Sequence, residues 1–403
     1  MRVAVLGGGL QGCCVAMALA SAGVQVDLYD RNEALLNEAS VRNEGKLHLG
    51  YVYAHDRSLQ TARLMLRGAA AFAPLLRRWV GSDIDRIPVS SRFHYVAHRD
   101  SLLSSDEIAD HLSNCCGFAR DEVEGTADYF GMDFREPPTP LAGYGNVFDD
   151  RTVARVFRTA EIAIDTEVMA ATVRQGVARY PNIRCVLRAN IKRVATTDRQ
   201  AEVFFSIAGD EFRQSYDHVV NATWESRLAI DATMGVQPPR PWLFRLKHYI
   251  RVRPPASMAG AIPSTTIVLG PFGDIVAYQN GEMYLSWYPV ALAGRSAAVS
   301  PPDWRQDLDG EPAMGMFSAV TRGLSAVVPN VARLAAETDG RPRVKGGIIF
   351  AWGSSDIDDP TSVLHQRAAI GLKRFGRYCS IDTGKLTMAP LFGKMAADGI
   401  LNS

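Results

Sequence analysis

Residues 1–30 read MRVAVLGGGLQGCCVAMALASAGVQVDLYD, and this stretch decides the fold. Residues 2–6 are a short apolar run of the length expected for a buried parallel strand. A glycine turn follows, and the small apolar residues 13–22 predict a helix that packs closely on a sheet and ends at Gly23. Residues 24–30 alternate and predict a second strand. The stretch therefore predicts the strand–turn–helix–strand unit of a doubly wound α/β domain.

The glycine turn satisfies the pattern G-x-G-x-x-G. Its first glycine allows a tight turn, its second lets the backbone approach a pyrophosphate, and its third lets helix and strand pack closely. The start of the helix offers unpaired N–H groups to phosphates, and the acidic residue that ends the second strand accepts hydrogen bonds from a ribose. The pattern predicts an adenine dinucleotide, either NAD or FAD, held by Gly7, Gly9, Leu10, Gln11, Gly12, Asp30 and Arg31.

Composition and charge exclude several classes of function. The chain has 403 residues, which predicts two domains or one large domain with an insertion. Its 44 basic and 43 acidic residues leave a net charge of +1, so no nucleic-acid partner is expected. The six cysteines show no C-x-x-C and no metal-ligand spacing, and no metal is expected. With no leader pattern and no apolar run long enough to span a bilayer, the sequence predicts a cytoplasmic protein, and peripheral attachment to a membrane stays open.

Residues 42–51 read RNEGKLHLGY, and two glycines surround the histidine at position 48. An amphipathic helix is predicted after this loop, at about 58–80. Together with the Rossmann start, the pattern Ser/Asn-Gly-x-x-His-x-Gly resembles the FAD-dependent D-amino-acid oxidase superfamily, nearest its L-2-hydroxyglutarate and glycerol-3-phosphate dehydrogenase branches. The resemblance implies that FAD is the cofactor and that this loop crosses the isoalloxazine ring. The residues that it assigns to FAD here are Ser40, Asn43, Gly45, Lys46, Leu47 and His48.

Three later segments carry the same resemblance. Residues 164–195 are similar to the helix and strands that bring a backbone to the adenine, at Ile191. Residues 216–226 resemble the second strand of the FAD domain, with Asn221, Ala222 and Trp224 beside the cofactor, although Thr223-Trp224 replaces the family's glycine. Residues 380–401 resemble the element that faces the flavin pyrimidine. Its helix N–H groups and lysine would stabilise reduced flavin, and the residues concerned are Gly384, Lys385, Leu386 and Thr387.

Four side chains are candidate catalytic residues. On the family's pattern, His48 lies near flavin N5, either as the general base that takes a hydroxyl or amine proton or as a covalent attachment point for the flavin. Lys385 stabilises the reduced flavin. Tyr53 follows the histidine loop and is expected to line the site with Tyr51. Tyr249 and Arg251 alternate along HYIRVRP, so one strand face would present an arginine to a carboxylate or phosphate.

The resemblance also implies the architecture. The expected fold class is α/β, with a Rossmann-type FAD-binding domain and an inserted antiparallel-sheet substrate domain. The FAD-binding domain is assigned residues 1–84, 151–226 and 346–403, and the substrate domain is assigned 85–150 and 227–345. Asn280-Gly281 between two alternating runs predicts a hairpin in the substrate domain. Residues 346–360 lack the arginine that related dehydrogenases carry there, which favours a larger, more neutral or sugar-like substrate.

These features predict an FAD-dependent oxidoreductase, either an oxidase or a dehydrogenase. Such an enzyme would remove hydride from a CH–OH or CH–NH carbon of a small molecule to flavin N5. Oxygen, a quinone and a protein all stay open as the electron acceptor. The alternatives are a flavin monooxygenase, a flavoprotein subunit used mainly for binding or assembly, and an enzyme that uses NAD alone.

Overall fold

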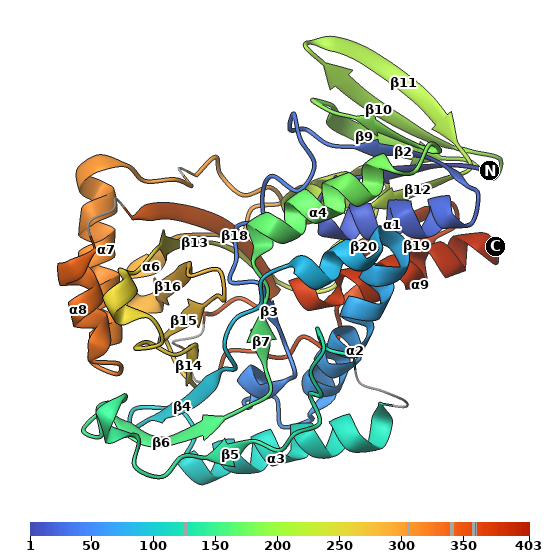
Figure 1. Ribbon diagram of the computed structural model, residues 1–403. Coiled ribbons are helices and arrows are strands. Elements are labelled where there is room, and N and C mark those ends of the chain that lie inside the picture. The colour runs from blue at the N-terminus through green and yellow to red at the C-terminus, as the bar shows by residue number, and fades with distance from the viewer. Residues whose placement is uncertain (124–127, 305, 339–341, 357–358, 360) are drawn as a thin grey trace.

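The protein is built around two large sheets joined at the centre of the molecule (Figure 1). The computed structural model describes residues 1–123, 128–304, 306–338, 342–356, 359 and 361–403. One sheet is mainly parallel and carries the N-terminal strand, and the other is mainly antiparallel. The predicted fold class, an α/β dinucleotide-binding domain with an inserted antiparallel-sheet domain, is confirmed.

The first sheet has six strands, and the predicted N-terminal unit lies at its centre. Its strand β1 (Arg2–Leu6) is buried on both faces, as its continuous apolar sequence requires. All neighbouring pairs are parallel except the one at the β19 edge. In spatial order the strands are β19 (Gly371–Phe375), β20 (Tyr378–Asp382), β12 (His218–Asn221), β1, β2 (Gln25–Tyr29) and β8 (Ile183–Val186).

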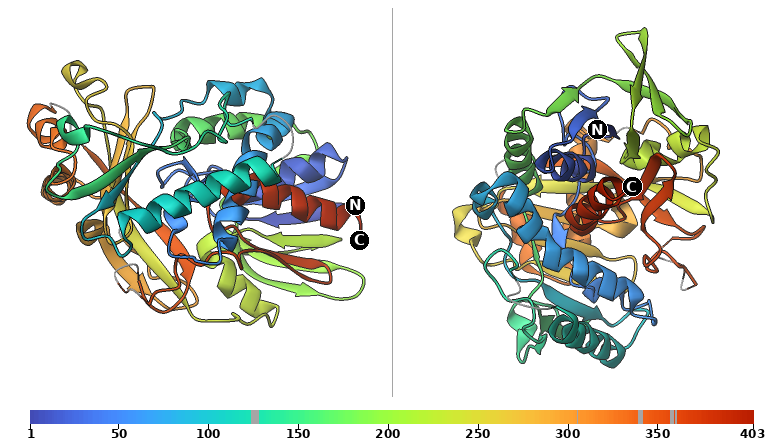
Figure 2. Two further views of the ribbon diagram at one scale, coloured as in Figure 1. Left: turned by 90° about the horizontal axis from the view of Figure 1, so that it is seen from below. Right: turned by 90° about the vertical axis from the view of Figure 1, so that its right-hand side faces the viewer.

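Helices cover one face of this sheet and a small sheet covers the other (Figure 2). The predicted helix near 58–80 spans Gln60–Val80. The C-terminal helix α9 (Ala389–Leu401) lies so close to α1 (Leu10–Ser21) that a Cβ on Gly393 would be 2.6 Å from Cys14. Small residues at these crossings therefore bring the C-terminal helix beside the glycine turn. The helices are α1 (Leu10–Ser21), α2 (Gln60–Val80), α4 (Thr166–Ala178) and α9 (Ala389–Leu401). The opposite face carries β9 (Asn190–Thr196), β10 (Ala201–Ile207), β11 (Asp210–Tyr216) and α5 (Arg227–Thr233).

The second sheet has nine strands, and its two faces differ in chemistry. Along its longest strand, β13 (Trp242–Val252), Ile250 and Val252 pack beneath two helices, whereas Lys247 and Tyr249 lie on the opposite face. The predicted hairpin at Asn280-Gly281 joins β15 to β16. The strands are β17 (Leu292–Ser296), β13 (Trp242–Val252), β16 (Met283–Trp287), β15 (Gly273–Ala277), β14 (Thr265–Val268), β4 (His94–His98), β6 (Val153–Arg158), β5 (Thr139–Pro140) and β18 (Arg343–Trp352).

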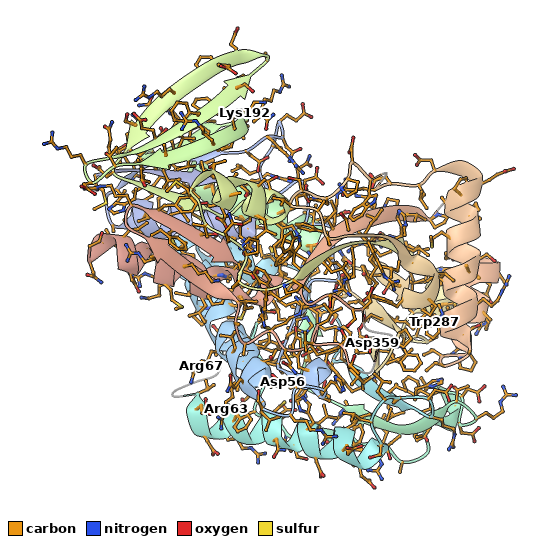
Figure 3. All side chains as sticks on the ribbon, turned by 180° about the vertical axis from the view of Figure 1, so that it is seen from behind. Asp56, Arg63, Arg67, Lys192, Trp287 and Asp359 are labelled. Atoms are coloured by element: carbon orange, nitrogen blue, oxygen red, sulfur yellow. The ribbon has the colours of Figure 1, made fainter. Side chains whose placement is uncertain are left out.

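Further helices and a two-stranded ladder complete the fold. Trp287, at the end of β16 (Figure 3), lies against α7, where a Cβ on Gly323 would come within 2.5 Å of its indole. Arg63 and Arg67 of α2, also labelled in Figure 3, form ion pairs with Glu122 of α3. These elements are α3 (Ser105–Glu122), α6 (Tyr288–Ala291), α7 (Gly310–Ser325), α8 (Asn330–Glu337), β3 (Lys46–Leu47) and β7 (Ile162–Ala163). None of the helices in the described part of the chain is long and apolar enough to cross a membrane.

Two of the expected domain boundaries are corrected by the strand pairing. Strand β6 pairs with β4, so residues 153–158 belong to the nine-stranded sheet rather than to the FAD-binding domain. Strand β18 pairs with β13 along its whole length, so the boundary expected at 346 cuts through a strand of the same sheet. Strand membership follows hydrogen-bond partners that are distant in sequence, which a motif search along the chain does not reveal.

Candidate active site

Two cavities meet at the glycine turn. The larger lies between the histidine loop, the polar face of the nine-stranded sheet and the start of the C-terminal element. The smaller lies at the end of β2 and reaches the small three-stranded sheet. Both are lined by Gly9, Ala39, Ser40, Ala222 and Trp224, so the second glycine of the motif stands at their junction.

Most of the predicted site residues line these cavities. The larger cavity is lined by Gly9, Leu10, Gln11, Ser40, Asn43, Lys46, His48, Tyr53, Ala222, Trp224, Gly384, Lys385 and Leu386. The smaller cavity is lined by Gly7, Gly9, Asp30, Arg31, Ser40, Ile191, Ala222 and Trp224. The predicted residues that line neither are Gly12, Gly45, Leu47, Asn221, Arg251 and Thr387. The fold thus brings together segments from both ends and the middle of the chain.

The conformation of the glycine turn is fixed by close backbone packing and by hydrogen bonds to Asp30 and Ser40. Gly7 has φ +94°, a conformation that favours glycine, and a Cβ on Gly12 would lie 1.8 Å from the Gly7 carbonyl oxygen. Asp30 accepts hydrogen bonds from the N–H groups of Gly8 and Asn32, at 2.7 and 2.8 Å. The Ser40 hydroxyl accepts the N–H of Leu10 at 2.8 Å. Gly12 therefore acts through packing, as predicted, and Asp30 also orders the turn itself.

The substitution of the family's glycine at Thr223-Trp224 has a local explanation. Trp224 adopts φ +55°, in the left-handed region that glycine enters most easily. Its indole N–H donates to the carbonyl of Ile348 at 2.9 Å, which holds the strained residue against β18. Asn221 is buried and lines neither cavity, and its side chain is hydrogen-bonded to Arg227, Asp231, Tyr378 and Thr223.

His48 projects into the larger cavity from an irregular loop. Its side chain is buried, and its Nδ1 makes no hydrogen bond within the described residues. The ring packs edge-on against Tyr53, whose buried hydroxyl has no partner among the described residues either. Burial, followed by the charges of Lys385, Lys46 and Arg367, holds the pKa of His48 well below its usual value. The imidazole is therefore neutral at physiological pH and is able to accept a proton.

The two lysines predicted near the flavin have different surroundings. Lys46 donates to Thr266 and Asp274, each at 2.6 Å, and so ties the histidine loop to the nine-stranded sheet. Burial acts to lower the pKa of Lys46, but Asp274 and neighbouring carboxylates outweigh it and raise the pKa. Lys385 makes no ion pair within the described residues, and burial, followed by the charge of Arg367, lowers its pKa to about 7. Lys385 is thus the lysine whose charge responds to a ligand.

Thr387 contacts the main chain of the histidine loop and lines neither cavity. Its hydroxyl accepts the N–H of His48 at 2.9 Å and donates to the carbonyl of Lys46 at 3.2 Å. Gly45, with φ +69°, has room for no side chain, because a Cβ there would lie 2.0 Å from the carbonyl oxygen of Ile164. Leu47 is fully buried in the core behind the loop. These three residues fix the conformation of the histidine loop on the side that faces away from the cavity.

Arg251 does not reach the cavity, contrary to expectation. It is buried in an ion pair with Asp165 at 2.8 Å, and the same carboxylate caps the start of α4. The residues on the same strand face that do line the cavity are Arg245, Lys247 and Tyr249. Strand alternation identifies the face that carries Lys247, Tyr249 and Arg251 but not the point at which the cavity ends.

Sequence reasoning also missed the arginine that closes the cavity. Arg367 follows the stretch 346–360, in which no substrate arginine was found and of which residues 357, 358 and 360 lie outside the described part. Its guanidinium is buried and donates only to main-chain carbonyls, those of Leu364, Phe350 and Gly384. It makes no ion pair within the described residues. No periodic pattern marks this loop, so the sequence held no signal for it.

The DAO family, described as FAD dependent oxidoreductase, matches residues 2–399 of the chain. The chain belongs to this family. Its fold is similar to that of glycine oxidase from Geobacillus kaustophilus (TM-score 0.68, 15% identity, 100% of this chain and 95% of that one). It is also similar to that of iminodiacetate oxidase from Chelativorans sp. BNC1 (TM-score 0.69, 15% identity, 100% of this chain and 96% of that one). A third similar structure is L-alpha-glycerophosphate oxidase from Mycoplasma pneumoniae (TM-score 0.64, 13% identity, 100% of this chain and 94% of that one). A stretch of 104 residues is 35% identical to FAD-dependent monooxygenase FPY4 from Fusarium mangiferae and spans 25% of this chain and 28% of that protein.

The protein is thus an FAD-dependent oxidoreductase, and its cavities suit that cofactor. The junction at Gly9 suits a pyrophosphate, because Gly9 lines both cavities and puts no side chain between them. The Asp30 carboxylate would hold the ribose, and the main chain near Ile191 would lie beside the adenine. The larger cavity, with Lys385 and Leu386 at the start of the C-terminal element, would hold the flavin. FAD supplies the redox chemistry when it is bound.

Replacing Lys385 with methionine is expected to stabilise the flavin-free protein in a pH-dependent way. Below about pH 7 the lysine is charged in both states, and the folded state bears the full cost of burying that charge. Between about 7 and 10.5 only the unfolded state keeps the proton, so wild-type stability rises with pH. The gain in unfolding free energy from Lys385→Met should therefore be largest near pH 6 and should shrink toward pH 9.

Urea unfolding of the flavin-free protein at several pH values measures this difference. Lys394→Met is the matched control, because Lys394 lies on α9 in a half-exposed ion pair with Asp398. Its effect should be small and without the same trend. A constant gain for Lys385→Met from pH 6 to pH 9 would contradict a lowered lysine pKa.

Proposed function

We propose that this enzyme oxidises a CH–OH or CH–NH carbon of a small molecule that carries a negative charge. The observation that carries the proposal is an excess of unpaired cations in the larger cavity. Lys247, Arg367 and Lys385 line it and make no ion pair within the described residues. Among the described residues of the cavity wall, one carboxylate without an ion pair, that of Glu44, stands against them. Buried cations without a counter-charge are costly, so an anionic ligand is their natural partner.

The proposed roles of the neighbouring side chains follow from their surroundings. His48 takes the hydroxyl or amine proton of the substrate, because its imidazole is buried, neutral and unpartnered at Nδ1. Burial raises the pKa of Tyr53, which therefore keeps its proton and can donate a hydrogen bond to the substrate heteroatom. Lys247 and Arg367 bind the anionic group and orient the carbon to be oxidised.

Anaerobic bleaching of the flavin absorbance tests this function. The panel consists of short 2-hydroxy acids, amino acids and phosphorylated polyols, each with an uncharged alcohol or amine of the same carbon skeleton. We expect charged members to bleach the flavin and their uncharged counterparts to fail. Equal bleaching by the uncharged compounds would contradict an anion-binding cavity. Reoxidation by air or by a soluble quinone then identifies the acceptor.

Substitution of Lys247 or Arg367, the two unpaired cations assigned to the anionic group, is expected to weaken substrate binding. A hydrogen bond to a charged group contributes about 1.5–3 kcal/mol, so Lys247→Met and Arg367→Met should each raise KM roughly 10- to 100-fold. Arg42→Met is the matched control, because Arg42 also lines the larger cavity but is already paired with Glu38 and Asp307. Steady-state kinetics with the fastest-bleaching compound measure the effect. Equal KM values in all three variants would remove the two cations from substrate binding.

Monooxygenation is a second candidate, favoured by the 104 residues that are 35% identical to FAD-dependent monooxygenase FPY4. The two candidates differ in the source of electrons. An oxidase or dehydrogenase is bleached by its substrate alone, whereas a flavin monooxygenase needs a separate reductant such as NADPH. Flavin that is bleached only by NADPH, with labelled oxygen incorporated into a product, would favour the second candidate.

A further inference from the structure

The main chain around His48 is held by side chains from distant parts of the protein. Buried main-chain polar groups need hydrogen-bond partners, and four side chains supply them for five groups of this loop. The carbonyls of Lys46, Leu47 and Gly50 contact side chains, and so do the N–H groups of His48 and Leu49. The partners, in chain order along the loop, are Thr387, Tyr129, Thr387, Glu161 and His111.

Glu161 differs from the other partners because it is an acidic residue with no access to solvent. Its exposed fraction is 0%, and one carboxylate oxygen accepts the N–H of Leu49 at 2.7 Å. The other oxygen accepts the hydroxyl of Tyr95. Burying a carboxylate costs several kcal/mol, whereas an apolar residue would fill the same space without that cost. The position of this group therefore calls for a reason beyond core packing.

The geometry places Glu161 on one of the two peptide groups that flank the His48 Cα. The preceding peptide is fixed by the His48 N–H bond to Thr387, and the following peptide is fixed by the Leu49 N–H bond to Glu161. Because peptide groups are planar, fixing both leaves His48 little backbone freedom. Contact with the Tyr53 ring, 5.6 Å between centroids, then restricts the imidazole.

We propose that Glu161 is a positioning residue that fixes the main chain after His48 and thereby aims the imidazole into the cavity. The proposal rests on the proposed role of His48 as the base. Glu161 itself lines neither cavity, so it acts only through the loop. The Glu161 oxygen can accept the Leu49 N–H whether or not the carboxyl group is charged, and it provides the partner that this buried N–H needs.

The test compares Glu161→Gln, Glu161→Ala and Tyr95→Phe in the FAD-loaded protein. Glutamine keeps an acceptor for the Leu49 N–H, alanine removes it, and Tyr95→Phe removes the other hydrogen bond of Glu161 while the loop contact remains. The probe is the NMR signal of His48 in protein with labelled histidine, assigned by its loss in His48→Gln. We expect alanine to shift or broaden this signal and to slow flavin reduction by the fastest-bleaching compound at least 10-fold. Glu161→Gln should keep the wild-type NMR signal and a rate of flavin reduction within about 3-fold of wild type. We expect the same two results for Tyr95→Phe.

The outcomes separate this proposal from the proposed function. If His48→Gln reduces its flavin as fast as wild type, the role of His48 fails, while the NMR signal still reports on Glu161. If His48→Gln is slow but Glu161→Ala keeps the wild-type signal and rate, the positioning role is wrong. If glutamine is as damaging as alanine, the negative charge matters rather than the hydrogen bond, and the proposal is overturned. Should Glu161→Ala fail to fold, an altered His48 signal in folded Glu161→Gln would contradict it equally.

Discussion

Replacing His48 with alanine should leave FAD bound and slow flavin reduction by substrate roughly 10²- to 10⁴-fold, the usual contribution of a general base. The imidazole lines the larger cavity, is neutral, and has an Nδ1 without a partner in the described structure. Because the pKa of His48 lies well below its usual value, the base form persists at acidic pH. The acid limb of kcat/KM should therefore fall below pH 6.5 in the wild type and should disappear in the variant.

Stopped-flow absorbance measures this rate, and His94→Ala is the matched control. His94 is also partly buried with a lowered pKa, but its ring packs on Phe148 and lines neither cavity. Its substitution should leave the rate nearly unchanged. Acid precipitation of the wild type also reveals whether the flavin is covalently attached, since only non-covalent FAD is released. A wild-type rate in His48→Ala would remove this histidine from the mechanism.

Replacing Gly9 with valine is expected to abolish FAD binding. Gly9 stands where the two cavities meet, and even a Cβ at this position would lie 3.1 Å from the Ser40 hydroxyl. That hydroxyl accepts a hydrogen bond from the N–H of Leu10. A branched side chain at position 9 would therefore both narrow the junction between the cavities and disturb the start of α1. The pyrophosphate would then meet a side chain where it needs bare backbone. The ratio of flavin absorbance to protein absorbance after reconstitution with FAD measures the loss.

Gly117→Val is the control for a general effect of losing a glycine. Gly117 lies within α3, and no atom stands within 4 Å of the Cβ that the substitution adds. That variant should bind FAD as the wild type does, and its stability should be unchanged or slightly higher, because valine has a higher helix propensity than glycine. A fully flavin-loaded Gly9→Val protein would show that the pyrophosphate lies elsewhere.

The predictions that succeeded from sequence rest on local patterns. The strand–turn–helix–strand unit over residues 1–30 is encoded in consecutive residues, and the structure reproduces it as β1, α1 and β2. The helix predicted at 58–80 and the hairpin at Asn280-Gly281 are local in the same way. The cofactor and the family could also be predicted from sequence, because the glycine pattern, the histidine loop and the C-terminal element each span only a few consecutive residues.

The predictions that failed depend on contacts between distant segments. Arg251 was expected to bind a ligand, but Asp165, which is 86 residues earlier, neutralises it inside the protein. Strand β6 and the larger part of β18 were assigned to the FAD-binding domain, but their hydrogen-bond partners belong to the nine-stranded sheet. Arg367 and Lys247 became candidates for substrate binding only when the fold placed them around one cavity without carboxylate partners.

By itself the sequence determined that this chain holds a dinucleotide on a glycine turn and presents a histidine loop near it, since both features depend on neighbouring residues. Only the tertiary structure decided which charged side chains are neutralised and which face the cavity. It also revealed that Glu161, 112 residues after Leu49, holds the histidine loop from behind. Charge pairing and burial are properties of positions in space, and residues that meet in space need not be close along the chain.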